Sequence, residues 1–572
     1  MSVDSVGKSL TQRVVSQDGT GLSRPMISAT KHNVVAGHYL ATQAAFSILE
    51  KGGNAVDAGV AAGLTLSVVQ SDVVNFAGVA PMLIYTAKTR EVTCVAGLGH
   101  WPKAMTPDLF QRHHGGKIPA GVLRTVVPAA PDAWITALSH FGTMTFGEVS
   151  AEAIRLARDG FVMYPMMANI ISAFAAEYAR WPSNAEIYLP NGRAPLAGEK
   201  FIQKDLAATI QYMVDQEANT QGGRLAGLAA ARNAFYYGDI ATTITHYHRE
   251  HGGLLTMEDL ANYRSEIETP TKASFDKYHL FTCPAWCQGP ALIEIMRLAD
   301  ALKVSSHPHN SPAYMHLLIE AIKIAFADRH DWFGDPRHVA VPLERLLSVE
   351  YARQRAEGID PESAAIDLPP SPQDASVALD TSYVCVVDRH GNSISATPSD
   401  VSMDTPVIPG TGICPSSRGS QSWANPQHAS SVAPGKRPRL TPSPAMAITR
   451  DGRIIPFGTP GGDVQLQAMA QVFLNLTEFG FNAQAAVDAP RFASYDSEDS
   501  FEPHVRLPGR VNLEADIPSE ATEALRLLGH DVVGWPVKTW RAGAVCILDF
   551  NPATGVSFAG ADPRRPSYAI GS

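Results

Sequence analysis

The sequence has few cysteines, a low share of charged residues and no long hydrophobic run, and these shortages exclude several classes of protein. Its 572 residues include six scattered cysteines, too few for a disulfide-rich scaffold and without the paired spacing of a zinc site. Such usage is typical of a reducing compartment. The longest weakly polar stretch, residues 60–69, is too short to span a bilayer. The polar N-terminus shows no signal peptide, so we expect a cytoplasmic protein with no membrane partner.

Charge also argues against one kind of partner. The formal net charge is −10, and the basic residues form no stripe along the chain. Nucleic-acid binding therefore has no electrostatic support. Hydrophobic residues make up 45% of the sequence, which is enough for a large core and, at this length, for more than one domain.

The hydrophobic pattern predicts helices and strands in a particular distribution. Helices are predicted at residues 42–51, 55–68, 145–161, 201–216 and 314–328, and a hairpin at 81–97. Between residues 130 and 330 the only clear strand candidate is 277–283. After residue 381 we predict strands at 381–388, 393–397, 444–450, 454–458, 544–550 and 556–559, with helices at 463–479, 483–489 and 517–528. Strand pairs flanked by helix pairs indicate stacked sheets covered on both outer faces.

Thr381 stands at the start of a predicted strand with alternating apolar residues, directly after a segment suited to cleavage. Residues 366–379, IDLPPSPQDASVAL, contain three prolines and no helical period, so we expect this stretch to stay accessible. After Thr381 a strand, a turn at residues 388–392 and a second strand predict a hairpin.

A threonine becomes a useful nucleophile when its own α-amine is free. An α-amino group has a pKa near about 8, so at neutral pH a usable fraction can accept the hydroxyl proton. Cleavage between Asp380 and Thr381 would create this arrangement in one step. The alternative is that Thr381 is an ordinary threonine at the start of a strand.

Two glycines, Gly461 and Gly462, separate a predicted strand from a predicted helix. Their peptide N–H groups can point at one spot near the positive end of a helix dipole, which is what an oxyanion hole requires. The alternative is a plain strand-to-helix turn that uses glycine for its backbone angles.

Eight short sequence blocks are distributed along nearly the whole chain, and their order matters as much as their residues. They are GGNAVDAGVAA (52–62), YYGDIA (236–241), GGLLTMEDLANY (252–263), TSYVCVVDRHGNSISATPS (381–399), PGKRP (434–438), TPGGD (459–463), DAPRF (488–492) and ADPRR (561–565). Together they resemble the γ-glutamyltranspeptidase (glutathione hydrolase) family of N-terminal-nucleophile hydrolases.

The resemblance implies an α+β fold, a four-layer αββα sandwich. It implies a precursor that cleaves itself into a large subunit, residues 1–380, and a small subunit, residues 381–572, which stay together as partners. Thr381 would be the nucleophile, and Gly461 and Gly462 would form the oxyanion hole. Ser399 occupies the position where the family usually has a second threonine that hydrogen-bonds the nucleophile.

The predicted chemistry requires no metal and no organic cofactor. One run, residues 246–251, is rich in histidine. It lacks the spacing that puts two metal ligands on one helix face, so we expect a solvated helix end instead.

The positions that recognise substrate depart from the family pattern. The transpeptidases hold the glutamate α-carboxylate with an arginine after the early hairpin; in this chain His100 or Trp101 stands near that place, and neither is a permanent cation. The acidic residue expected within residues 412–423 is missing, and Arg418 is found there. Thr441 keeps one of two hydroxyls that follow the KRP block. His100, Arg418 and Thr441 are the candidate substrate contacts; the alternative for Arg418 is a surface or interdomain salt bridge, and for Thr441 a packed hydroxyl.

A site that loses an amine-binding carboxylate and gains a guanidinium should prefer an anionic or carbonyl-rich group. We therefore predict an N-terminal threonine hydrolase or acyltransferase of γ-glutamyltransferase type that acts on a small-molecule amide through an acyl-enzyme. One alternative is an acylase or amidohydrolase for a non-glutamyl amide, such as an oxamate-like or acylated metabolite. The other is a homologue that binds a metabolite without turnover.

Overall fold

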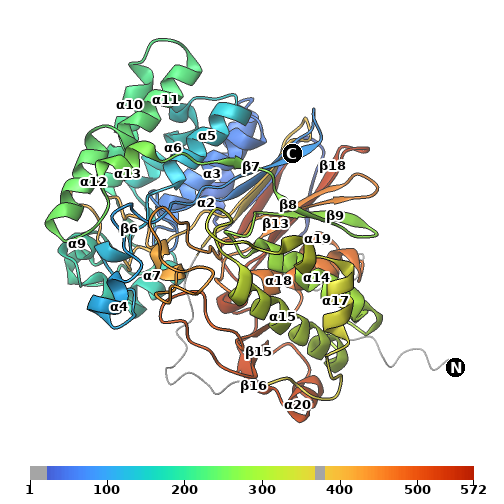
Figure 1. The fold of residues 1–572 in the computed structure, drawn as a ribbon. Coiled ribbons are helices and arrows are strands. Elements are labelled where there is room, and N and C mark those ends of the chain that lie inside the picture. Colours follow the sequence, from blue (N-terminus) through green and yellow to red (C-terminus); the bar gives the residue numbers. More distant parts are fainter. Residues whose placement is uncertain (1–21, 367–380) are drawn as a thin grey trace.

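Two seven-stranded sheets form the centre of the computed structural model, which describes residues 22–366 and 381–572 (Figure 1). The first sheet has the order β1 (Ile27–Ala29), β18 (Val556–Ala561), β17 (Cys546–Asn551), β13 (Ile454–Gly458), β12 (Ala445–Thr449), β9 (Tyr278–Thr282) and β8 (Thr271–Ser274). The second has the order β19 (Tyr568–Gly571), β2 (Asn33–Ala36), β10 (Val384–Val387), β11 (Ser393–Ala396), β3 (Met82–Thr86), β4 (Glu91–Val95) and β7 (Ile267–Glu268). All neighbouring strands in both sheets are antiparallel.

The strand that follows Thr381 is buried on both faces, as the alternation of its apolar residues predicts. Tyr383, Cys385 and Val387 lie in the apolar layer between the two sheets. Val384 and Val386 point the other way and join the cluster beneath the first group of helices. Because successive strand residues face opposite sides, this strand contributes to two cores at once.

Helices cover the outer face of each sheet. The second sheet is covered by α2 (Tyr39–Glu50), α3 (Ala55–Val69), α5 (Ala130–Phe141), α6 (Phe146–Asp159), α10 (Lys204–Ala218) and α11 (Arg224–Tyr236). The first is covered by α14 (Gly289–Ala301), α15 (Pro312–Trp332), α17 (Val349–Ala356), α18 (Val464–Thr477) and α19 (Ala483–Asp488). This arrangement confirms the predicted α+β fold with four αββα layers.

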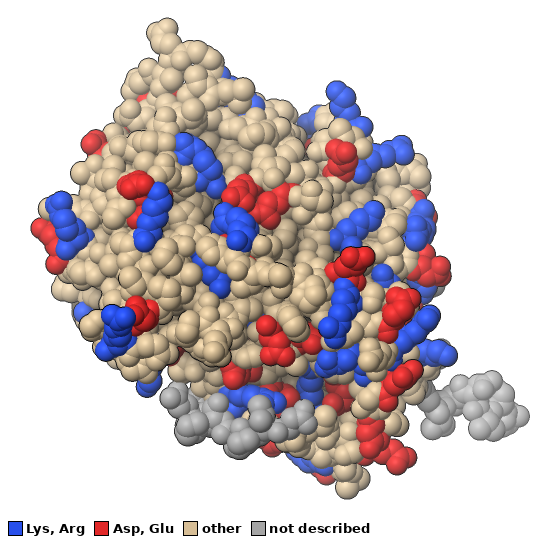
Figure 2. Space-filling model, in the orientation of Figure 1, with Lys and Arg blue, Asp and Glu red and all other residues tan. Residues whose placement is uncertain are grey.

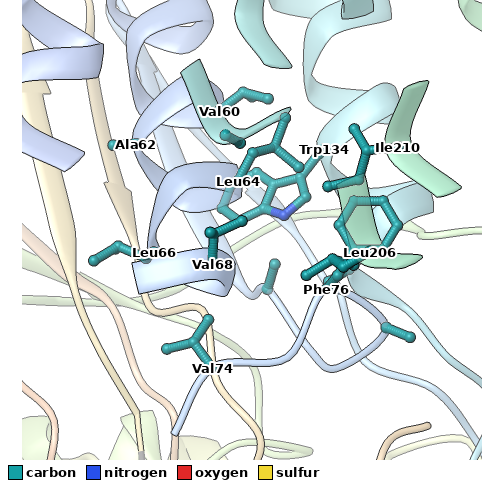
Figure 3. Close-up of a cluster of buried hydrophobic side chains, with 14 of the residues drawn as sticks. Val60, Ala62, Leu64, Leu66, Val68, Val74, Phe76, Trp134, Leu206 and Ile210 are labelled. Atoms are coloured by element: carbon teal, nitrogen blue, oxygen red, sulfur yellow. The ribbon is translucent and has the colours of Figure 1, made fainter. Parts of the chain in front are cut away.

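Helix α3 is the central element of its layer, and every one of its residues is buried. Figure 3 shows Leu64 and Val68 of this helix next to Trp134 of α5. Gly63 permits that contact, since a Cβ at this position would come within 2.4 Å of the Trp134 ring. A helix that is apolar on all sides is typical of a position between a sheet and further helices.

The remaining elements lie around this sandwich. A small sheet contains β14 (Phe492–Ser494), β15 (Arg510–Glu514) and β16 (Asp531–Trp535), with α20 (Ser519–Leu527) beside it, and a ribbon contains β5 (Phe161–Val162) and β6 (Lys200–Phe201). The other helices are α4 (Leu109–His114), α7 (Pro165–Ala173), α8 (Ala175–Tyr178), α9 (Pro182–Tyr188), α12 (Asp239–Glu250), α13 (Met257–Asn262), α16 (Leu343–Leu346), η1 (Val122–Arg124), η2 (Pro190–Gly192), η3 (Val304–Ser306), η4 (Arg418–Gln421) and η5 (Trp540–Ala542).

The surface carries charges of both signs. On the face shown in Figure 2, basic and acidic side chains are interspersed and form no stripe of one sign. Within residues 22–366 and 381–572, no helix combines the length and the apolar character needed to cross a bilayer.

Most predicted elements are present within a few residues of their predicted bounds, and three predictions need correction. Between residues 130 and 330 the prediction of a single strand is wrong, because β5 to β8 are also there. After residue 381 the short strands β14, β15, β16 and β19 were not predicted. These strands have two to five residues each, and pairing rather than local pattern defines them. The run at 246–251 is only partly solvated, since His248 is fully buried and burial lowers its pKa to about 4.

Candidate active site

The hairpin of β10 and β11 places Thr381 and Ser399 side by side. Its register pairs Val384 with Ala396, so the residues three positions outside that pair are Thr381 and Ser399. Thr381 Oγ1 lies 2.7 Å from Ser399 Oγ, and both side chains are buried. The predicted contact between the two hydroxyls is therefore present.

Thr381 is held on both sides of its backbone. Its N–H donates to Val73 O at 3.2 Å, and Arg565 donates to its carbonyl oxygen at 3.3 Å. Its φ of 77° is in the left-handed region, which is costly for a β-branched residue and is typical of functional sites. Asp380, the other half of the predicted cleavage site, lies outside the described residues.

Arg418 contacts Ser399, and this corrects one of the two interpretations of the arginine. Its side chain is 1% exposed, and Nη2 donates to Ser399 Oγ at 2.5 Å. Its Nε lies 3.6 Å from a carboxylate oxygen of the buried Asp400. The interpretation as a surface salt bridge is therefore wrong. The guanidinium lies one hydroxyl away from Thr381, where its charge favours a developing anion.

Asp400 organises the loop that delivers Arg418. Its two carboxylate oxygens accept hydrogen bonds from the hydroxyls of Ser416 and Ser417, each at 2.5 Å, and from Ser417 N–H at 3.0 Å. Its own N–H donates to Val73 O at 3.1 Å, the same carbonyl that binds Thr381 N–H. The loop before η4 is thereby tied to the end of β11.

Gly461 and Gly462 connect β13 to α18 with φ angles of +124° and +55°. The peptide plane that contains the Gly461 N–H is fixed because Thr459 Oγ1 donates to Pro460 O at 2.9 Å. The plane that contains the Gly462 N–H is fixed because Val464 N–H donates to Gly461 O at 2.9 Å. Two N–H groups with fixed directions at a helix N-terminus are suited to binding an oxyanion.

Helix α18 begins close to Thr381. Gln465, in its first turn, donates from Nε2 to Thr381 Oγ1 at 3.4 Å and accepts from Ser443 N–H at 3.2 Å. Since the positive end of the helix dipole lies at this terminus, it also favours negative charge on the threonine oxygen.

A buried network supports the glycine turn from behind. Gln288 donates to Gly462 O at 3.2 Å and to Thr441 O at 2.7 Å, and its Oε1 accepts from Arg329 at 2.7 Å. Arg329 also pairs with Asp463. Burial raises the pKa of the Asp463 carboxyl, but Arg329 and Ser500 outweigh burial, so the pKa is lowered and the carboxyl is ionised.

The other two candidate substrate contacts have protein partners in the structure. Thr441 is fully buried, and its hydroxyl accepts from Gln421 Nε2 at 2.8 Å. His100 is part-buried, with Nδ1 3.0 Å from Trp101 O and its ring near Tyr263. Burial lowers the pKa of His100, so the ring is neutral at pH 7. The described contacts of these two residues do not include Thr381 or Ser399.

Several residues of the site were not predicted from the sequence. The sequence features that could have indicated them differ from residue to residue. Asp400 directly follows Ser399, so its position in the sequence was a usable signal. Gln465 stands at a helix start, and an amide there is ambiguous between packing and function. Val73 contributes only a carbonyl oxygen, which no side-chain pattern reports.

Comparison with known proteins agrees with the resemblance carried by the sequence blocks. The family model described as gamma-glutamyltranspeptidase matches residues 41–572. The "Glutathione hydrolase-like YwrD proenzyme" of Bacillus subtilis is 29% identical over 550 residues, 95% of this chain and 99% of that protein. The "Acylase ACY 1 proenzyme" of Pseudomonas sp. (strain SE83) is 32% identical over 541 residues, 92% of this chain and 91% of that protein.

A solved structure shares the whole architecture. The cephalosporin acylase from Bacillus halodurans superimposes with a TM-score of 0.84 at 28% identity, over 96% of this chain and 97% of that one. The chain belongs to the gamma-glutamyltranspeptidase family, and it is similar to hydrolases and acylases made as proenzymes.

Proposed function

We propose that this protein is an amide hydrolase or acyltransferase whose nucleophile is the hydroxyl of Thr381, exposed as a new N-terminus by cleavage after Asp380. The observation that supports this most directly is the pair of hydroxyls Thr381 and Ser399, 2.7 Å apart and buried at the start of α18. A threonine in an ordinary strand needs neither this pairing nor a positive φ angle.

The proposed reaction has two halves. The free α-amine of Thr381 takes the hydroxyl proton, and Oγ1 attacks the carbonyl carbon of the substrate amide. The N–H groups of Gly461 and Gly462 stabilise the oxyanion, a role worth about 2.7–4 kcal/mol per donor in a known protease. The C–N bond breaks, the departing amine takes the proton, and an ester on Thr381 remains. Water or an acceptor amine then attacks this ester and restores the threonine.

Ser399 and Arg418 support the step in which charge develops. Ser399 Oγ accepts a hydrogen bond from Arg418, which makes its own O–H a stronger donor. Directed at Thr381 Oγ1, that O–H stabilises the oxygen as it loses its proton. The same pair serves the cleavage of the precursor, because before cleavage the Thr381 nitrogen is an amide and cannot act as a base.

For the substrate we keep two candidates. The relatives include a glutathione hydrolase-like protein and an acylase. The missing acidic residue at 412–423 favours a non-glutamyl amide, because no carboxylate in that segment can pair with a glutamyl α-amine. A screen that compares a γ-glutamyl anilide with simple acyl anilides decides this. Strong turnover of the γ-glutamyl compound would contradict the argument from the altered pocket.

The nucleophile is tested by mass spectrometry and N-terminal sequencing of purified protein. Wild type should consist of two polypeptides that meet between residues 380 and 381, and Thr381→Ala should stay full-length and inactive. Thr397→Ala, which changes a buried threonine on the same hairpin, should mature normally. Cleavage of Thr381→Ala at the same bond, or an active protein with no chain starting at Thr381, would refute the assignment. An intact wild type without turnover would support the metabolite-binding alternative.

A further inference from the structure

A hollow of about 930 Å³ is lined in part by Arg565, which donates to the carbonyl oxygen of Thr381. Its walls come from α7 and the residues on either side of it, from η5 and from the loop before β19, and they include Tyr164, Ile170, Phe174, Trp540, Arg541 and Arg565. This volume is within the range of sites for small organic ligands, which is about 300–1,000 Å³.

The lining of this hollow is both aromatic and cationic. Among residues 22–366 and 381–572, four arginines contribute to it and no aspartate or glutamate does. Two of them are already engaged: Arg564 pairs with Glu514 and Asp562, and Arg24 lies over the ring of Tyr568 and donates to Ser567 O.

Arg541 differs from the other arginines in the lining. It is exposed, and among the described residues no acidic side chain forms an ion pair with it. Its guanidinium lies 5.5 Å from the ring centre of Trp540, so an aromatic surface and a cation stand next to each other. This combination suits a ligand with an apolar body and an anionic end, because a guanidinium binds a carboxylate through two parallel hydrogen bonds.

Arg565 connects the hollow to the reacting residue. It lines the hollow, stands 5.7 Å from the ring centre of Trp540 and donates to the carbonyl oxygen of Thr381. A molecule in the hollow therefore lies one side chain away from the nucleophile, on the carbonyl side of Thr381. Ser399 and Arg418 stand at its hydroxyl.

We propose that this hollow is a substrate subsite that binds the apolar, carboxylate-bearing part of the amide, with Arg541 pairing with the carboxylate and Trp540 packing against the apolar body. This inference rests on the proposed function, since it assumes that the amide reacts at Thr381. It extends that function by naming a substrate class, amides whose larger part ends in an anion.

Kinetics with three anilides test this subsite and identify the part that enters it. They are hexananilide, adipic acid monoanilide with its carboxylate on the acyl part, and hexanoyl-4-aminobenzoate with its carboxylate on the amine part. Arg541→Gln should lower kcat/KM about tenfold for one carboxylated substrate and leave hexananilide within about twofold. The substrate that is affected shows which part binds there. Arg526→Gln, on the distant α20, should change none of the three. Equal effects of Arg541→Gln on all three anilides would overturn the proposal.

A binding measurement separates this inference from the assignment of the nucleophile, because it needs no turnover. In calorimetry, 3-phenylpropanoate should bind wild type about tenfold more tightly than the neutral 3-phenylpropanamide, and Arg541→Gln should remove that preference. Trp540→Leu should weaken both compounds alike. If the two compounds bind wild type equally, the subsite is refuted even when Thr381 is the nucleophile. If the preference exists but Thr381→Ala still matures, the nucleophile is wrong; the hollow then binds the anionic ligand but is not a subsite for a reaction at Thr381.

Discussion

The guanidinium of Arg418 donates a hydrogen bond to the hydroxyl of Ser399, with 2.5 Å between Nη2 and Oγ. Ser399 Oγ in turn lies 2.7 Å from Thr381 Oγ1. A serine hydroxyl has one proton and two acceptor sites. Because Arg418 uses one acceptor site, the serine proton can point at Thr381. The cation therefore acts on the threonine oxygen through a single hydroxyl.

This relationship predicts the effect of removing the Ser399 hydroxyl. Ser399→Ala should lower kcat about 10- to 100-fold, because it removes one hydrogen bond to an oxygen that becomes negatively charged. Ser399→Thr keeps the oxygen and should retain most of the activity. Steady-state kinetics, normalised to the fraction of each protein that has matured, measure both. Ser393→Ala is the control, since Ser393 Oγ has no hydrogen-bond partner among the described residues. Full activity of Ser399→Ala would contradict the role.

A substitution at Gly461 tests whether the site needs this backbone conformation, because there is room for a side chain at this position. An added Cβ would meet only ordinary contacts, at 3.6 Å from Gly543 Cα and Val464 Cβ, but the φ of +124° is strained for any other residue. Gly461→Ala should therefore turn the peptide N–H away and lower kcat about 10²- to 10³-fold, with a smaller change in KM.

The control for this variant is Gly452→Ala. Gly452 also has a positive φ, +87°, and lies in the turn between β12 and β13 with nothing within 4 Å of the added Cβ. It should lose stability by about 1 kcal/mol and keep its activity. If both variants lose stability and neither loses kcat, Gly461 is only a turn residue.

We expect Gln288 to contribute to the stability of the fold as well as to activity. It donates to Gly462 O and accepts from Arg329, and all of these groups are buried or part-buried. Gln288→Leu leaves two carbonyls and a guanidinium each short of a partner, so we expect a loss of about 2–4 kcal/mol in the free energy of unfolding and a lower kcat. Urea titration and kinetics measure the two effects. Gln427→Leu, on the surface, should change neither.

The contact between the two hydroxyls could be predicted from the sequence because it depends on a local pattern. The turn at residues 388–392 is centred on residue 390, and Thr381 and Ser399 stand nine positions on either side of it. An antiparallel hairpin with that centre pairs these two residues, as the observed register does. The two glycines before a helix could be predicted for the same reason.

The place of Arg418 could not be predicted from its neighbours in sequence. Residues 412–423 have no helical or strand period, so nothing local indicates whether the side chain points outward or inward. Its position is set by Asp400, which binds Ser416 and Ser417 from another part of the chain. The same limit applies to His100, whose ring lies near Tyr263 of a distant segment, and to Thr441, whose hydroxyl is bound by Gln421.

Asp72 predicts an unusual dependence of stability on pH. Its side chain is 2% exposed, and Oδ1 has no hydrogen-bond partner among the described residues. Burial raises the pKa of this carboxyl from 3.8 to about 7, although Arg565 opposes the shift. The groups that interact with its charge are Arg565, Tyr164, Tyr178 and Tyr188. The next carbonyl along the chain, Val73 O, binds Thr381 N–H.

The direction in which stability changes with pH follows from the raised pKa of Asp72. The folded protein holds the Asp72 proton more tightly than the unfolded chain, so this stabilising effect is complete below pH 3.8 and is lost as the pH rises to about 7. Asp72→Asn cannot ionise. Its stability relative to wild type should therefore rise between pH 4 and pH 8, by up to about 4 kcal/mol at about 1.4 kcal/mol per pKa unit. Chemical unfolding at several pH values measures this difference, and Asp516→Asn, at an exposed aspartate, should show no such trend. A difference that stays constant with pH would mean that Asp72 is ionised in the folded protein, with its charge compensated at the Thr381 site.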